Sequence, residues 1–164
     1  MSIPERRFCN LAFESVDGKA PDTISGVAIT YGDTAEMLFG KEVVEPGAFG
    51  DVSKLDLVLN MQHDRTRPLA RTGGGGLTLS DDNQRLTVEA TLPDTTDGLD
   101  AKKLVAGRIL RGLSIEMIVT KSQTVDGVRR ISAARLVGIG LVDKPAFPKS
   151  VLAAQKTERR RMWL

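Results

Sequence analysis

The chain has 164 residues, of which 41% are hydrophobic and 27% charged, a size and composition that fit one globular domain with a single core. The formal net charge is only +2, which argues against a general polyanion binder, and five Phe, one Tyr and one Trp are too few to stack successive nucleic-acid bases. One cysteine and one histidine exclude an intramolecular disulfide and a Cys/His zinc cluster.

The sequence shows no apolar run long enough for a signal peptide or a membrane-spanning helix. We therefore expect a soluble cytoplasmic protein without membrane contact, without a cofactor or metal, and without a specific nucleic-acid partner. Residues 151–164 carry four Lys and Arg against one Glu, a local charge of +3. We expect one folded domain over 1–150, followed by a basic tail over 151–164 that is exposed or partly helical.

Short stretches of alternating apolar and polar residues dominate the chain and predict a mainly β fold. The predicted strands are 25–31, 55–62, 76–79, 85–92, 113–120, 128–132 and 136–142. Glycines at 73–76 predict a hairpin turn, and the Asp-Gly pair within 125–127 predicts a second one, so antiparallel pairing is expected.

One helix is predicted over residues 99–106. Asp97 is its expected N-cap, Gly107 its expected end, and Leu99, Leu104 and Val105 its core-facing residues.

His63 is the only histidine, so a mechanism that needs an imidazole base near neutral pH must use it. It follows a predicted strand and precedes a polar loop. The alternative is an ordinary surface or hydrogen-bonded histidine.

Ser114 and Glu116 share the face of strand 113–120 that is predicted to stay outside the core. A serine becomes a nucleophile only if an adjacent base takes its proton, and His63 is the one available base of this kind. Glu116 would orient the imidazole. Alternatively, both residues are ordinary exposed strand positions.

Other candidates point more weakly to chemistry. Cys9 is a competing nucleophile, with Arg6 and Arg7 able to lower its thiol pKa, but a structural thiol is the simpler interpretation. The glycines at 73–76 lack the Lys-Ser/Thr of a phosphate-binding loop, and the acidic residues at 94–100 lack the spacing of a calcium loop.

Four segments in order form a recognisable series: 45–49 (EPGAF), 59–64 (LNMQHD), 112–115 (GLSI) and 140–147 (GLVDKPAF). Together they resemble the tailed-phage prohead proteases, which are related to the herpesvirus assemblins. The resemblance covers roughly residues 20–150, and phage-derived gene transfer particles carry similar proteins. It implies a serine endopeptidase on a mainly antiparallel β-barrel flanked by helices, an α+β fold, with His63 as base and Ser114 as nucleophile.

The third member of the site departs from the family pattern. The strand before the Leu-Val-x-x-Pro element commonly carries an acidic residue in the family, whereas residues 136–140 are uncharged here. Our hypothesis is that Glu116 replaces it, with Gly138 and Gly140 leaving room on the adjoining face. Asp64, Asp143 and a bare Ser/His dyad stay open as alternatives.

The oxyanion-binding groups are not identified by the sequence. Arg111 and Lys144 are candidates, each with the alternative of a solvated surface charge.

The same resemblance implies a capsid or scaffold protein as substrate inside an assembling procapsid, with self-cleavage and a homodimer or higher oligomer as further possibilities. It also implies low activity before encapsidation. A docking role and a solvated end both stay open for the tail. The rival function is a non-enzymatic capsid-assembly or scaffold protein that keeps a protease-like barrel.

Overall fold

The computed structural model describes residues 3–10, 22–37 and 39–143, and of residues 8–10 it describes the backbone. This part of the chain is mainly β with one α-helix, which confirms the expected α+β class. The strands are β1 (Glu5–Asn10), β2 (Thr23–Thr30), β3 (Ala35–Met37), β4 (Gly40–Val44), β5 (Val58–Met61), β6 (Pro68–Arg71), β7 (Leu77–Asp81), β8 (Arg85–Thr91), β9 (Gly112–Val125) and β10 (Val128–Val142); the helices are α1 (Thr96–Ala106) and a single 3-10 turn, η1 (Val52–Lys54).

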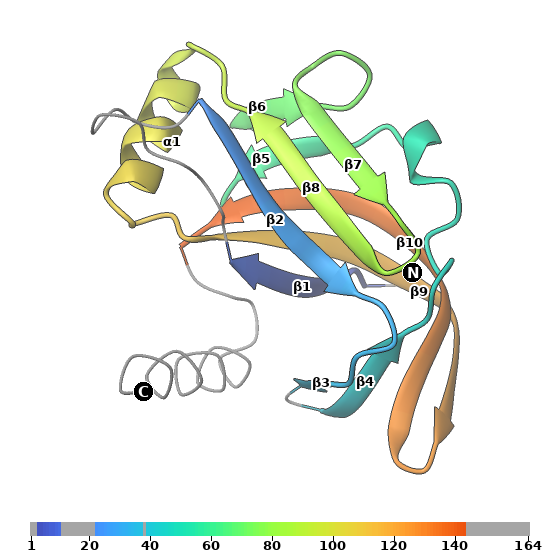
Figure 1. Cartoon of the computed structure of the whole chain (residues 1–164). Coiled ribbons are helices and arrows are strands. Elements are labelled where there is room, and N and C mark those ends of the chain that lie inside the picture. Colours follow the sequence, from blue (N-terminus) through green and yellow to red (C-terminus); the bar gives the residue numbers. More distant parts are fainter. Residues whose placement is uncertain (1–2, 11–21, 38, 144–164) are drawn as a thin grey trace.

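The strands form two sheets. In the larger one β9 pairs antiparallel with β1 and with β10, while the other edge of β10 pairs first with β4 and then with β5. The smaller sheet has the order β2-β8-β7 and lies across the larger one (Figure 1). β4 and β5 run parallel to β10, where the sequence predicts antiparallel pairing. Among the described residues the pairings do not close a ring, so the expected barrel is replaced by two sheets.

The core lies between the sheets and is built from the apolar positions of the alternating strands. Leu86 and Val88 of β8 and Ile115 and Met117 of β9 have no exposed surface. Each such side chain stabilises the fold by about 1.5–3 kcal/mol relative to exposure. The strands predicted at 85–92 and 113–120 are therefore confirmed, together with the side of each that enters the core.

The longest hairpin joins β9 to β10. Asp126 and Gly127 form its turn with φ angles of 51° and 77°, which confirms the predicted Asp-Gly turn. β10 is one continuous strand where the sequence predicts two, because irregularities in its register at 131–134 and 136–138 interrupt the alternation.

The glycines at 73–76 do not form the predicted hairpin turn. They lie between β6, which belongs to the larger sheet, and β7, which belongs to the smaller one. Gly73, Gly74 and Gly76 all have positive φ angles, which glycine adopts readily, and this allows the chain to pass from one sheet to the other.

Helix α1 begins earlier than predicted. The side chain of Thr95, not that of Asp97, is the N-cap: its oxygen accepts a hydrogen bond from the amide of Gly98 at 3.1 Å. Asp97 instead accepts a hydrogen bond from Arg67 Nε at 3.0 Å.

The core-facing side of α1 also differs in part from the prediction. Val105 is fully buried and Leu104 packs against the core, but Leu99 is 43% exposed and Ala101 takes its place inside. At 3.6 residues per turn, Leu99 lies about 120–140° around the helix from Leu104 and Val105, whereas Ala101 is four residues before Val105 and shares its face.

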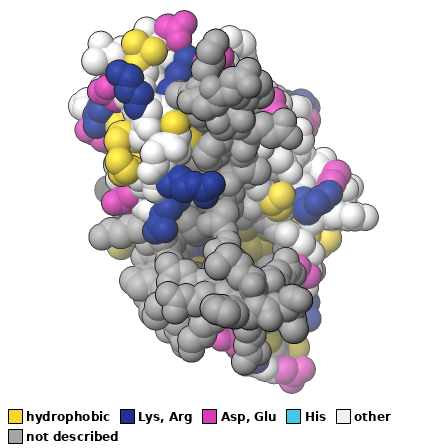
Figure 2. Space-filling model, turned by 60° about the vertical axis from the view of Figure 1, so that its left-hand side comes forward, with side chains coloured by type: hydrophobic (Ala, Val, Ile, Leu, Met, Phe, Trp, Pro, Cys, Tyr) yellow, Lys and Arg dark blue, Asp and Glu magenta, His cyan; other side chains and the backbone are white. Residues whose placement is uncertain are grey.

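Charges are interspersed on the described surface. Lys and Arg side chains stand among Asp and Glu side chains on the face shown in Figure 2. None of the helices in the described ranges has the length and apolarity that a membrane crossing requires. The basic tail at 151–164 lies outside the described residues.

Candidate active site

A tight turn after β5 presents His63. The amide of Asp64 donates a hydrogen bond to the carbonyl of Met61 at 2.9 Å, and the amide of Gln62 donates one to Leu141 of β10 at 2.8 Å. The two central residues, Gln62 and His63, have φ angles of 52° and 59°. This conformation costs a non-glycine residue about 1–2 kcal/mol and persists only where the surroundings enforce it. The turn therefore fixes the direction of the imidazole.

The imidazole meets a carboxylate from β9. His63 Nδ1 lies 2.5 Å from Glu116 Oε1, and the two side chains are only 10% and 14% exposed. The same carboxylate oxygen lies 3.3 Å from Arg6 Nη2 of β1. Two segments far apart in sequence thus converge on Glu116.

Glycines on β10 make room for the imidazole ring. A Cβ atom placed on Gly140 would lie 2.6–2.7 Å from three ring atoms of His63, so the ring occupies the space of a side chain at that position. Gly140 pairs directly with Ser114, and Gly138 with Glu116, in the antiparallel ladder of β9 and β10. Directly paired residues project to the same face of a sheet. His63, Ser114 and Glu116 therefore share one face.

Ser114 is buried, with 2% of its surface exposed, although the sequence predicts an exposed position. The difference arises because the turn carrying His63 folds back over this face of the sheet. Ser114 Oγ and His63 Nε2 are both fully shielded and have no hydrogen-bond partner among the described residues, so they do not bond to each other. An unpartnered buried polar group costs about 1–3 kcal/mol, and two on adjoining positions call for an explanation.

The surroundings favour the neutral form of the imidazole. Burial lowers the pKa of His63 below its ordinary value, the Glu116 carboxylate opposes this shift, and the Arg6 guanidinium adds to it. A neutral imidazole with Nδ1 facing a carboxylate carries its proton on Nδ1, which leaves the lone pair on Nε2. The group is thus suited to accept a proton through Nε2.

The competing acidic groups, Asp64 and Asp143, have other contacts in this structure. Asp64 is exposed and accepts hydrogen bonds from the amide and hydroxyl of Thr66, at 2.9 and 2.6 Å. At Asp143 the backbone amide approaches Gln62 Oε1, at 3.4 Å. Of the three carboxylates considered from the sequence, Glu116 is the one that contacts the imidazole.

Arg111 is exposed at the start of β9, whereas Lys144 and the side chain of Cys9 lie outside the described residues. Of the two arginines considered as activators of Cys9, Arg6 pairs with Glu116 and Arg7 with Glu42. Sequence reasoning missed the contact between Arg6 and Glu116, because it depends on the pairing of β1 with β9.

A hollow of about 310 Å³ adjoins the imidazole. Its walls combine apolar and charged groups, and its lining includes His63, Glu116, Arg65, Val58, Val137 and Ile139. Among the described residues no cluster of three or more His, Cys, Asp and Glu side chains forms a metal site.

A family model described as the caudovirus prohead serine protease matches residues 10–162, nearly the whole chain. No curated protein and no solved structure matches the chain. The match includes the positions of His63, Ser114 and Glu116, and the chain therefore belongs to the family of caudovirus prohead serine proteases.

Proposed function

We propose that this protein is a serine endopeptidase that cleaves a capsid or scaffold protein inside the assembling procapsid. The observation that carries the proposal is the placement of the His63 imidazole, which contacts Glu116 through Nδ1 and occupies the Cβ space of Gly140 opposite Ser114. The family match supports the reaction class.

The roles follow from the chemistry of acyl transfer. Glu116 orients the imidazole and stabilises its protonated form, while His63 Nε2 accepts the hydroxyl proton of Ser114 as Oγ attacks the peptide carbonyl. Protonated His63 then gives the proton to the leaving amine, and water releases the acyl group by the reverse transfers. For this transfer the two unpartnered atoms, Ser114 Oγ and His63 Nε2, must come within hydrogen-bond distance of each other.

The shielded hydroxyl supports low activity before encapsidation. A substrate carbonyl reaches Ser114 Oγ only after neighbouring atoms move, because both reacting atoms are inaccessible to solvent in this structure. Local concentration in the procapsid, or assembly into a dimer or larger oligomer, would supply that change. Self-cleavage and docking through the tail at 151–164 belong to the same proposal.

Co-expression with the capsid protein of the same particle tests the proposal. A shortened capsid band is expected with the wild type and with Ser122→Ala, which removes an exposed serine of the same strand. The band should be absent with Ser114→Ala and with His63→Ala. Labelling by a fluorophosphonate should follow the same pattern.

The rival function, a non-enzymatic assembly protein with a protease-like fold, predicts a different result. Capsid protein would then keep its length with the wild type, and shell assembly would be equal for the wild type and Ser114→Ala. Cleavage that persists in Ser114→Ala would remove this serine as the nucleophile.

A further inference from the structure

Strand β1 places an arginine beside the carboxylate that contacts His63. Arg6 is directly paired with Glu116 in the antiparallel ladder of β1 and β9, so both side chains project to the same face. Arg6 Nη2 lies 3.3 Å from Glu116 Oε1, the same oxygen that lies 2.5 Å from His63 Nδ1. One carboxylate oxygen therefore joins the guanidinium to the imidazole.

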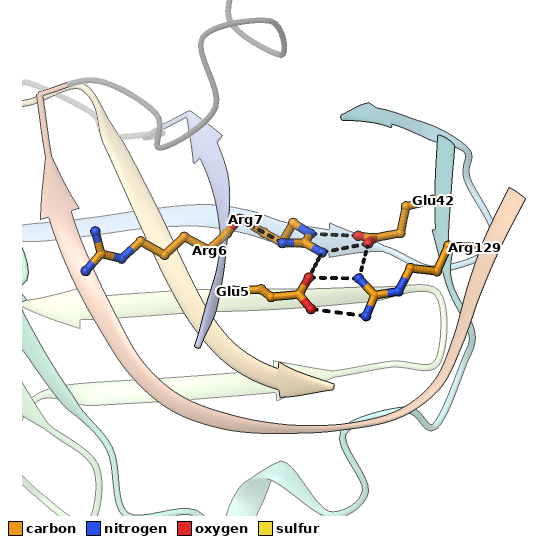
Figure 3. Close-up of polar contacts among 5 residues, drawn as sticks. All are labelled: Glu5, Arg6, Arg7, Glu42 and Arg129. Carbon is orange, nitrogen blue, oxygen red and sulfur yellow. Dashed lines mark hydrogen bonds and ion pairs between the residues drawn. The ribbon is translucent and has the colours of Figure 1, made fainter. Parts of the chain in front are cut away.

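The neighbouring residues of β1 anchor the strand in this register. Arg7 is buried and forms two hydrogen bonds of 2.6 Å with the carboxylate of Glu42 on β4. Glu5 accepts hydrogen bonds from Arg7 at 2.9 Å and from both terminal nitrogens of Arg129 at 2.9 and 3.1 Å. Figure 3 shows these four side chains gathered together, while Arg6 points away from them. Strand alternation thus sends Arg6 to the opposite side from the anchor.

On the basis of the proposed function, we propose that Arg6 is a positioning residue of the active site. It holds the carboxylate of Glu116 in place against the imidazole. Its positive charge adds to the effect of burial in favouring the unprotonated form of His63, the form that can act as a base. Arg6 does not touch the reacting atoms; it acts through Glu116.

The other charged groups around the imidazole do not substitute for Arg6. Asp56 and Arg65 line the adjoining hollow, but the carboxylate of Asp56 is held by Arg71 at 2.8 and 2.5 Å. Arg65 is exposed to solvent, and Asp64 is bonded to the adjacent Thr66. Arg6 is the described cation that contacts the carboxylate partner of His63.

A titration of His63 by proton NMR tests the role without needing catalysis. His63 is the only histidine, so its ring protons give one unambiguous set of signals. The full chain carrying Ser114→Ala avoids self-cleavage, and Arg6→Gln is compared with Arg6→Lys in that background. The matched control is Arg130→Gln. The Arg130 side chain is 49% exposed, against 46% for Arg6, and it pairs with Glu45. Arg130 lies at the end of β10 that is far from Gly140 and the imidazole.

We expect Arg6→Gln to raise the pKa of His63 by about half a pH unit, a small shift because solvent screens a half-exposed charge. Arg6→Lys should restore at least half of the shift, and Arg130→Gln should leave the pKa unchanged. A purely structural arginine would lower the free energy of unfolding without moving the pKa. Equal titration curves for Arg6→Gln and Arg130→Gln would overturn the proposal.

Cleavage gives the second measurement. In the protein with Ser114 intact, Arg6→Gln should shift the acidic limb of the kcat/KM profile to higher pH, by the same amount as the pKa of His63. The reason is that more of the imidazole is protonated at a given pH. If the wild type cleaves nothing, the proposed function fails, whereas the NMR titration still decides whether Arg6 controls His63. If cleavage depends on Ser114 but the wild type and Arg6→Gln have the same pH profile, only the role of Arg6 fails.

Discussion

Two polar clusters on the larger sheet differ in how far their hydrogen-bonding groups are used. In the anchor cluster of Glu5, Arg7, Glu42 and Arg129, both carboxylates bond to guanidinium groups, with two parallel hydrogen bonds between Arg7 and Glu42. In the cluster around His63, the imidazole Nε2 and the nearby Ser114 Oγ are buried without a partner. The first cluster has its hydrogen-bonding capacity largely used, and the second keeps two groups available.

The backbone repeats this contrast. The anchor cluster is carried by regular strands, whereas His63 is presented by two consecutive non-glycine residues with positive φ. Backbone strain and unpartnered buried groups both reduce the stability of the folded state, and both concentrate where a structure serves chemistry. We infer that the anchor cluster stabilises the fold, while the His63 cluster is retained for its reactivity.

The largest expected effect comes from exchanging a carboxylate for an amide in the anchor cluster. Glu42→Gln leaves the buried Arg7 without its main counter-ion and should lower the free energy of unfolding by about 3 kcal/mol, measured by urea denaturation. The folded fraction should keep kcat/KM within a few-fold of the wild type.

The same exchange in the His63 cluster should lower activity more than stability. Glu116→Gln should change the unfolding free energy by less than about 1 kcal/mol but lower kcat at least about a hundredfold, because the imidazole loses its orienting carboxylate. If both variants lose stability and activity in the same proportion, the distinction between the two clusters is wrong.

A smaller effect is expected from adding one methyl group beneath the imidazole. Gly140→Ala would bring a Cβ to 2.6–2.7 Å from the His63 ring, and the ring must move. Displacement of a catalytic group by about 1 Å costs up to about a hundredfold in turnover, so we expect a ten- to hundredfold loss of kcat/KM.

Gly138→Ala is the matched control for that substitution. The added Cβ would lie 3.6 Å from the nearest atom of Glu116, an ordinary contact, and activity should stay within a few-fold of the wild type. Equal losses in the two variants would show that the glycines matter for the strand and not for the space under the ring.

The sequence predicts what depends on local pattern and fails where partners are distant. The alternation of Leu86 and Val88 and of Ile115 and Met117 identifies two central strands correctly, and so does the Asp-Gly turn at 126–127. The sheet change at 73–76 could not be found this way, because a glycine-rich connection looks the same whether it returns to the same sheet or crosses to another.

The site shows the same limit. A single histidine, with a serine and a glutamate two residues apart on one strand, made these residues candidates, and the resemblance to the prohead proteases favoured His63 and Ser114 over the ordinary alternatives. The three residues share one face, and their catalytic roles stay a prediction. Their burial was not predictable, because it depends on the turn at 61–64 folding over β9 and β10. The contact between Arg6 and Glu116 was not predictable either, because it depends on the register in which β1 pairs with β9.

The smallest expected effect separates backbone strain from reactivity. Gln62→Gly relieves the cost of a positive φ, about 1–2 kcal/mol, but adds about 0.5–1 kcal/mol of chain entropy, so the net gain in unfolding free energy should be at most about 1.5 kcal/mol. Turnover should nevertheless fall a few-fold, because a glycine lets the turn sample directions in which the imidazole leaves Glu116. Arg108→Gly is the control, since Arg108 has a similar φ of 58° in the turn after α1. It should change stability by a comparable amount and leave turnover unchanged; equal turnover in both variants would mean that the turn conformation at residue 62 does not contribute to catalysis.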